Sequence, residues 1–387
     1  MIDIYTVKQF KYKNNIKGGY QMKNKMQMMM LVVLGILLVL TGCSNATNTK
    51  DAGNTSNKAS ESAANEQIDS ENAAEEKPQF EEKKIRVAYH PHIVGAGTIV
   101  MAEEMGYFDE VALKVDPVKF TAGPPELQAM ASGDIDLGYL GVGAHVLCPK
   151  GQCVILTLDS TDISNEVLAT VKSGVKEMKD LKGKTVAVPT GTTSDMVFTL
   201  ALEKAGMTKD DMNVVNMDVA GAVAAFVAEK VDAVAIWAPY TTEIRKQKGD
   251  DNVIELAHSK EFLPEKVFPQ SWVTTKKFAE NNRDVLVRFL MAWIKGNDYR
   301  YNKMDETVKL TSEFTQVPED SNAALVDTTY WMTSNEMKKL YEDGTALEWY
   351  SQQQDMFLSI GSLDQAVPVE EFVDFSYFME AWERVNQ

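Results

Sequence analysis

One stretch near the middle of the chain constrains its fold more than any other. Residues 185–188 form a short run of β-branched and apolar side chains, which predicts a buried strand. Pro189 ends that strand because proline has no N–H to donate to a neighbouring strand. A loop of small residues follows at 190–193, and from Met196 onward apolar residues recur at helical spacing. A strand, a tight loop and a helix in this order are typical of an α/β fold.

The loop itself favours a ligand with anionic oxygens. Backbone N–H groups converge where a helix begins, and the helix adds a partial positive charge of roughly 0.5. The hydroxyl groups of Thr192, Thr193 and Ser194 can supplement these donors, and Gly191 allows the tight turn. The same residue types also cap helices without binding any ligand. Both interpretations, anion binding and simple capping, are open at this point.

The first 21 residues have no apolar periodicity and no helix cap. Residues 17–22 can be back-translated into a ribosome-binding sequence directly before a start codon. We therefore interpret residues 1–21 as an untranslated leader and expect translation to begin at Met22.

The following segment, 22–42, has the organisation of a signal peptide. Lys23 and Lys25 precede an apolar run at 28–40, which is short for a membrane-spanning helix. The run ends in Leu-Thr-Gly-Cys43, which resembles the lipobox of bacterial lipoproteins. That resemblance implies that Cys43 is the lipidated N-terminus of the mature chain, anchored at the outer face of the cytoplasmic membrane. A transmembrane anchor is the alternative interpretation.

Residues 43–84 are rich in Ser, Asn, Ala, Glu and Lys and nearly free of large apolar side chains. Such a segment buries too little surface to offset the entropy lost on ordering, so we expect a disordered linker. The whole chain carries a formal net charge of −17, which argues against a nucleic-acid partner. A small anion is still compatible with this charge, because local dipoles rather than net charge capture it.

Cysteines and histidines set limits on redox and metal chemistry. Besides Cys43, only Cys148 and Cys153 are present, and they flank a turn. Outside the cell they can close a small disulfide, or they can be buried free thiols; both options are open. The four histidines are scattered and form no zinc-like spacing with cysteine, so we predict no metal site and no cofactor.

From residue 85 onward, strand-like and helix-like segments alternate, which predicts mainly parallel sheets covered by helices. Ligands bind such sheets at the carboxyl ends of the strands. Three loops in the first part of the folded chain lie at such ends, at 90–98, 121–125 and 140–144. The region beyond 276 is mostly helical by its pattern, including predicted helices at 285–300 and 361–384.

Four segments, taken in order, carry a family resemblance. They are Met-Gly-Tyr-Phe-Asp at 105–109, residues 129–138, Leu-Lys-Gly-Lys-Thr-Val-Ala-Val at 181–188, and Val-Asp-Ala-Val-Ala-Ile-Trp-Ala-Pro-Tyr at 231–240. Together they resemble the substrate-binding lipoproteins of ABC importers, within the nitrate/sulfonate/taurine group that shares its fold with pyrimidine-precursor binders. The resemblance implies two α/β lobes of the type II periplasmic-binding-protein fold, joined by two crossover strands. Lobe 1 would comprise 85–170 and 275–387, and lobe 2 would comprise 171–274.

The resemblance also implies a ligand site in the cleft between the lobes. It implies that the protein is a monomer and that its partners are an ABC permease and its ATPase. Relatives often carry Asp where Ala238 stands, and its loss argues against a ligand with a positive amine. We therefore predict capture of a small anionic solute such as an aliphatic sulfonate, with a pyrimidine-type thiamine precursor as the alternative. An enzyme of this fold is disfavoured, because no nucleophile and base pair with each other; a surface sensor is a further alternative. The predicted ligand contacts are His90, Gly97, Thr98, Gly141, Val142, Gly191, Thr192, Thr193, Trp237 and Tyr240.

Overall fold

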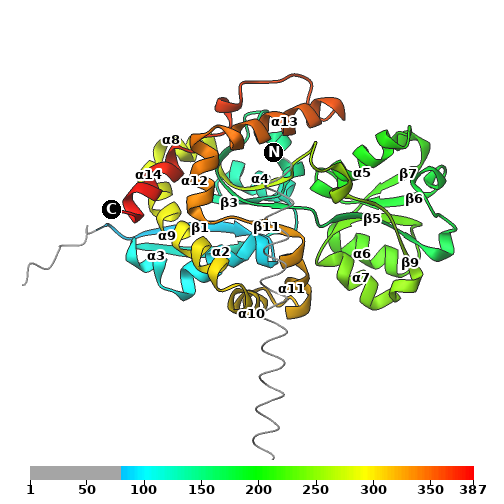
Figure 1. Ribbon diagram of the computed structural model, residues 1–387, viewed down its shortest axis with the longest axis horizontal. Helices are drawn as coiled ribbons and strands as arrows, with labels where there is room; N and C mark the ends of the chain where they lie inside the picture. The colour runs from blue at the N-terminus through cyan, green and yellow to red at the C-terminus, as the bar shows by residue number, and fades with distance from the viewer. Residues whose placement is uncertain (1–79) are drawn as a thin grey trace, which may run out of the picture. The chain divides into compact units, whose positions relative to one another are not determined.

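The computed structural model describes residues 80–387 (Figure 1). The predicted leader, the signal segment, Cys43 and the linker up to residue 79 lie outside the described residues. The end of the predicted linker is corrected slightly, because the first strand already begins at Lys83. Within the described part of the chain, no helix is long and apolar enough to cross a membrane.

The first sheet has six strands in the order β11-β4-β10-β3-β1-β2. Its strand β1 pairs in parallel with both β2 and β3, whereas β10 runs antiparallel between β3 and β4. Val87 in β1 and Leu137 in β3 are fully buried and lie opposite each other in the register. The strand bounds are β1 (Lys83–Tyr89), β2 (Leu113–Lys119), β3 (Leu137–Leu140), β4 (Val154–Asp162), β10 (Pro269–Thr274) and β11 (Thr329–Trp331).

Most helices in residues 80–387 belong to this first lobe. The long helix α9 packs against α2, α3 and α14, and its Phe289 stacks on Phe108 of α3 with ring centroids 5.8 Å apart. The helix bounds are α2 (Ile93–Glu104), α3 (Tyr107–Glu110), α4 (Gly123–Ser132), α8 (Lys276–Asn281), α9 (Arg283–Asn302), α10 (Met304–Thr315), α11 (Glu319–Asp327), α12 (Ser334–Glu342), α13 (Thr345–Ser359) and α14 (Ser376–Val385).

The second sheet has five strands in the order β7-β6-β8-β5-β9. Alternate side chains of β6 face opposite sides: Val186 and Val188 join a core with α5, and Ala187 joins a core with α6 and α7. Figure 1 accordingly shows α5 on one side of this sheet and α6 and α7 on the other. The bounds are β5 (Asn165–Thr170), β6 (Thr185–Val188), β7 (Asn213–Asn216), β8 (Ala233–Trp237), β9 (Val253–His258), α5 (Thr193–Lys204), α6 (Val219–Val227) and α7 (Tyr240–Lys248).

This architecture confirms the predicted α/β fold with two lobes, but the lobe boundaries differ. Strand β5 belongs to the second sheet and β10 to the first, so the predicted boundaries after residues 170 and 274 are each wrong by one strand. The first crossing lies between Asp162 and Asn165, where Ser164 donates two hydrogen bonds to the Asp162 carboxylate. The turn lies within a stretch of strand-like sequence at 154–170, so the sequence pattern does not show where the chain crosses between the lobes.

Two helices were also misplaced by the sequence pattern. Helix α2 begins at Ile93, within the loop predicted at 90–98, because the ring of His92 caps it by accepting the N–H of Gly95. The predicted helix at 361–384 exists only from Ser376 onward, whereas α12 and α13, which precede it, were not predicted. Cys148 and Cys153 form a disulfide, which decides between the two alternatives left open above.

Candidate functional site

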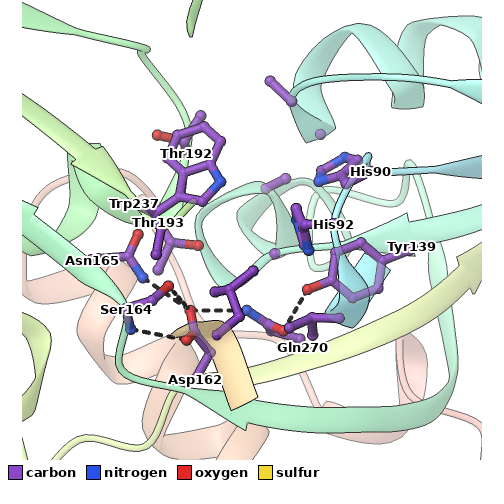
Figure 2. Close-up of a pocket in the computed structure, with 17 residues that line it drawn as sticks. His90, His92, Tyr139, Asp162, Ser164, Asn165, Thr192, Thr193, Trp237 and Gln270 are labelled. Carbon is purple, nitrogen blue, oxygen red and sulfur yellow. Dashed lines mark hydrogen bonds between the residues drawn. The ribbon is translucent and has the colours of Figure 1, made fainter. Parts of the chain in front are cut away.

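A pocket lies between the two sheets and takes its walls from both lobes (Figure 2). Its cavity volume is about 40 Å³, and the space between the walls continues into solvent. The side chains of His90, His92 and Tyr139 lie on one side, and those of Trp237 and Thr193 lie across from them. The lining residues are His90, His92, Val94, Ala122, Gly123, Tyr139, Gly141, Ala144, Asp162, Ser164, Asn165, Thr192, Thr193, Trp237, Ala238, Gln270 and Leu325.

The loop before α5 has a different geometry from the predicted anion site. Thr192 is the N-cap of α5 and accepts the N–H of Asp195, while its own hydroxyl donates to the carbonyl of Pro189 at 2.7 Å. The N–H of Gly191 donates to the carboxylate of Asp195 at 2.9 Å. Lys209 neutralises that carboxylate with an ion pair of 2.5 Å. The capping interpretation therefore describes these side chains, and the protein's own carboxylate takes one of the N–H groups expected to hold an anion.

The two lobes are in direct contact over the first turn of α5. The N–H of Gly143, in the first lobe, donates to the hydroxyl of Thr193 at 3.2 Å. A Cβ atom at position 143 would lie 2.1 Å from the carbonyl carbon of Thr192, so only glycine fits. The lobes are thus closed on each other at this point, and the first lobe covers the helix start.

Two histidines of the loop between β1 and α2 face the pocket (Figure 2). His90 places its Nε2 atom 3.0 Å from the carboxyl group of Glu126, which is fully buried in α4. His92 accepts the N–H of Gly95 at its Nδ1 atom, at 3.1 Å. Burial lowers the pKa of His92 to about 3, so this ring is uncharged at neutral pH. Both rings lie edge-on to the ring of Tyr139.

A network around Asp162 joins the lobes at the opposite end of the pocket (Figure 2). The carboxylate accepts hydrogen bonds from Ser164, from the Gln270 amide at 3.2 Å and from the Asn165 amide at 3.4 Å. Asn165 in turn accepts the hydroxyl hydrogen of Ser194, at the start of α5. Burial raises the pKa of Asp162 to about 6, and these hydrogen bonds oppose the shift. The pocket therefore contains one carboxyl group that titrates just below neutrality.

The aromatic wall comes from the end of β8. Trp237 lines the pocket, and Tyr240 supports it from α7 with the two rings nearly perpendicular and their centroids 5.6 Å apart. Ala238 also lines the pocket, so this position contributes no charge. Among the described residues, no lysine or arginine lines the pocket. The arrangement can therefore bind a small planar or partly apolar molecule through neutral hydrogen-bond donors.

The structure brings together half of the predicted contact residues. His90, Gly141, Thr192, Thr193 and Trp237 line the pocket, as expected from their positions at strand ends. Whether they contact a ligand stays a prediction.

The other five predicted residues lie elsewhere. Gly97 and Thr98 fall inside α2, where Gly97 packs against Arg300 and the Thr98 hydroxyl is directed at Asp159. The remaining three do not line the pocket: Val142 lies in an apolar cluster with α5, Gly191 lies outside the pocket wall, and Tyr240 stands behind Trp237.

Sequence reasoning missed several polar residues of the pocket. His92 was within reach, because it lies two residues from His90 in the same loop. Asp162, Ser164 and Asn165 were not found, because the turn between β4 and β5 lies within a continuous β-type run. Gln270 was not found either, since a buried glutamine in a strand has no distinguishing pattern.

One group of potential metal ligands occurs in the described residues, away from this pocket. It consists of Glu166, Glu255 and His258. The guanidinium of Arg245 forms ion pairs with both carboxylates, so it already supplies the cation there. His258 also accepts the backbone N–H of Lys260 through Nδ1, at 3.2 Å. These contacts explain the cluster as an internal ion-pair network.

Comparison with known proteins places the chain among binding proteins. The family model described as NMT1/THI5 like matches residues 95–307. A protein of Brucella abortus named as a binding protein is 33% identical over 294 residues, covering 76% of this chain and 91% of that protein. A Bacillus subtilis protein named for binding aliphatic sulfonates is 24% identical over 311 residues, covering 78% and 89%. The taurine-binding periplasmic protein of Escherichia coli is 27% identical over 233 residues, covering 58% and 71%.

Solved structures show the same fold. The alkanesulfonate-binding protein of Xanthomonas axonopodis pv. citri, bound to MOPS, superposes with a TM-score of 0.59 at 21% identity, covering 76% of this chain and 99% of that one. The periplasmic nitrate-binding protein of Synechocystis gives a TM-score of 0.63 at 15% identity, covering 79% and 89%. The two-lobed arrangement described above is therefore that of periplasmic binding proteins.

Proposed function

Because the chain belongs to the NMT1/THI5-like family, we propose that it is the solute-binding component of an ABC importer. The observation that carries this proposal is the pocket between the lobes, whose walls come from both sheets. A permease and an ATPase would be its partners. The sequence before residue 80 supports an extracytoplasmic protein held at the membrane by a lipid on Cys43.

Closure of the lobes on the solute would be the signal to the transporter. The direct contact of Gly143 with the start of α5 supports this role, because it can form only when the lobes meet. A ligand shifts such an equilibrium only as far as it prefers the closed state. We propose that contacts on both walls, to His92 and to Trp237, supply that preference.

The first candidate ligand is a small solute with an oxyanion end, such as an aliphatic sulfonate. Relatives named for sulfonate or taurine binding support it, as do the neutral donors of the pocket. The carboxylate of Asp162 opposes an anion, although four hydrogen-bond donors around it offset part of its charge.

The second candidate is an uncharged planar heterocycle of the aminopyrimidine type. Two observations favour it: the pocket lining contains no cation among the described residues, and Trp237 offers an aromatic face. A neutral ring avoids repulsion from Asp162 and stacks on the indole.

A thermal-shift panel on the purified protein separates these candidates. The probes are ethanesulfonate, taurine, nitrate and 4-amino-5-hydroxymethyl-2-methylpyrimidine. A ligand at ~100 times its Kd adds about 2.7 kcal/mol to the free energy of unfolding, which raises the Tm by several degrees. A shift with ethanesulfonate alone supports the sulfonate class, and a shift with the pyrimidine alone supports the second class. The absence of any shift would contradict both ligand classes.

A further inference from the structure

Glu126 is a carboxyl group buried behind the pocket. Its Oε2 atom lies 3.0 Å from Nε2 of His90, and its Oε1 atom has no hydrogen-bond partner among the described residues. Its side chain fills a space kept open by Gly138 of β3, where an added Cβ would lie 2.2 Å from Oε1. The absence of a side chain at Gly138 thus leaves space for Glu126, which forms no ion pair with lysine or arginine among the described residues.

The unpartnered oxygen indicates where the proton of this pair resides. A buried oxygen that carries charge and has no partner is costly, whereas an uncharged carbonyl oxygen tolerates the same position better. Burial also raises the pKa of Glu126. In the neutral acid, Oε2 donates its hydrogen to Nε2 of His90, and Oε1 is the uncharged oxygen. An uncharged His90 then carries its own proton on Nδ1.

His92 has the complementary tautomer. Its Nδ1 atom accepts the N–H of Gly95, so the uncharged ring carries its proton on Nε2. Neither Nδ1 of His90 nor Nε2 of His92 has a partner in the part of the chain that the structure describes. The two rings both line the pocket, with centroids 6.0 Å apart and planes at 77°.

The neighbouring side chains do not accept hydrogen bonds from Nδ1 of His90 or Nε2 of His92. The ring of Tyr139 lies 5.2 Å from His90 and 5.9 Å from His92, but its hydroxyl donates to Gln270. Asp162 faces Gln270 and the turn between β4 and β5 rather than the imidazoles. No other acceptor is directed at the free ring nitrogens within the described residues.

We propose that His90 and His92 form the acceptor-binding subsite of the pocket, with Glu126 as the positioning residue that sets the tautomer of His90. Two uncharged N–H groups would bind one acceptor group of the solute, either the oxygens of a sulfonate or the ring nitrogen of a heterocycle. This subsite takes the role first assigned to the loop before α5. The inference rests on the proposed function but can be tested separately from it.

The first test needs no ligand. Nitrogen-15 NMR of histidine-labelled protein at pH 7 distinguishes the two tautomers of each ring, and single His90→Gln and His92→Gln variants assign the signals. We expect His90 protonated at Nδ1 and His92 protonated at Nε2. Glu126→Gln keeps the His90 tautomer, because an amide N–H can still donate to Nε2, whereas Glu126→Leu releases it. A wild-type His90 protonated at Nε2, or at both nitrogens, would overturn the assignment.

The second test measures binding by titration calorimetry with ethanesulfonate and with the aminopyrimidine. We expect His92→Phe and Glu126→Leu to weaken the binding of whichever probe binds by about tenfold or more, as expected when a buried hydrogen bond is lost. Glu126→Gln should remain within about threefold of wild type. Wild-type affinity in His92→Phe would overturn the subsite. If neither probe binds, the proposed ligand classes fail, and the NMR spectra still decide the tautomers.

Discussion

Gly143 shows most directly how single residues set the behaviour of this protein. Its missing side chain lets the first lobe lie against the Thr192–Thr193 peptide of the second lobe. In the sequence, Gly143 is only one of several small residues in a loop. Glycine is required there because the backbone of the other lobe lies against it. The same limitation applies to Asp162, whose partners are brought to it by the fold.

We predict that Gly143→Ala weakens ligand binding more than it weakens folding. The added methyl group overlaps the Thr192 backbone only when the lobes are closed, and overpacking of this kind costs about 1–3 kcal/mol. Affinity for the bound probe should fall about ten- to a hundredfold by calorimetry, with little change in Tm. Gly221→Ala is the control, because its new Cβ would contact only Asp218, at 3.1 Å, and Met217, at 3.9 Å, and neither residue belongs to the contact between the lobes. Equal affinities of the wild type and Gly143→Ala would show that this contact does not govern closure.

Buried histidines should make the protein sensitive to acid. His145 hydrogen bonds to Gln353 through Nδ1, and burial lowers its pKa to about 4. In the unfolded chain, His145 has an ordinary pKa near 6.5. Between pH 6.5 and pH 4 it is therefore protonated in the unfolded chain but uncharged in the folded chain. Its contribution to stability is present above pH ~6.5 and is lost as the pH falls toward 4.

For His145 alone, this linkage lowers the free energy of unfolding by about 2 kcal/mol between pH 7 and pH 5. Urea denaturation of the wild type and His145→Gln at both pH values measures it, and the variant should lose about 2 kcal/mol less than the wild type over that interval. Using the difference between two pH values cancels any constant cost of the substitution. Identical losses in the two proteins would contradict the assignment of a neutral buried His145.

At the scale of elements, an ion pair joins helix α9 to strand β4 in the first lobe. Arg300 places Nη1 3.2 Å from both carboxylate oxygens of Asp159, and both side chains are almost fully buried. The indole N–H of Trp272, on β10, donates to the same carboxylate at 3.0 Å. The pair thus holds two of the strands next to the crossing in register with the helix layer.

We predict that Asp159→Asn lowers the free energy of unfolding by about 3–5 kcal/mol, because it leaves the Arg300 charge buried and unpaired. Asp116→Asn breaks an exposed pair with Lys84 and should cost less than about 1 kcal/mol. Both values come from urea denaturation at pH 7. A cost for Asp159→Asn as small as that of the control would refute the structural role given to the pair.

Individual helices and strands were predictable where the spacing of their apolar residues follows the period of a helix or a strand. Strands β1 and β6 and the helix after Met196 follow from β-branched runs and helical spacing, and the structure confirms them. The crossing after Asp162 was not predictable, because its turn has no glycine or proline and depends on a side-chain network. Helix α13 was missed because its apolar residues pack against both lobes and give no clean stripe.

At the scale of the whole molecule, the two sheets and the pocket between them account for the proposed role. The resemblance in four separated segments predicted the two-lobed fold correctly, since those segments contain the C-cap of α2, the end of α4 and the whole of strands β6 and β8. The site was predicted only in part, because a pocket between lobes collects residues that are distant in sequence. His90 and Trp237 were found by position, whereas Gln270 required the fold.

The central claim is that this pocket binds one small solute through both of its walls. Calorimetric titration of ethanesulfonate and the aminopyrimidine into the wild type, Trp237→Ala and His92→Phe tests it most directly. We predict binding of one probe at one molecule per chain, weakened about tenfold or more by each substitution, because each removes a contact on a different wall. Binding that neither substitution changes, or the absence of binding by both probes, would contradict the account.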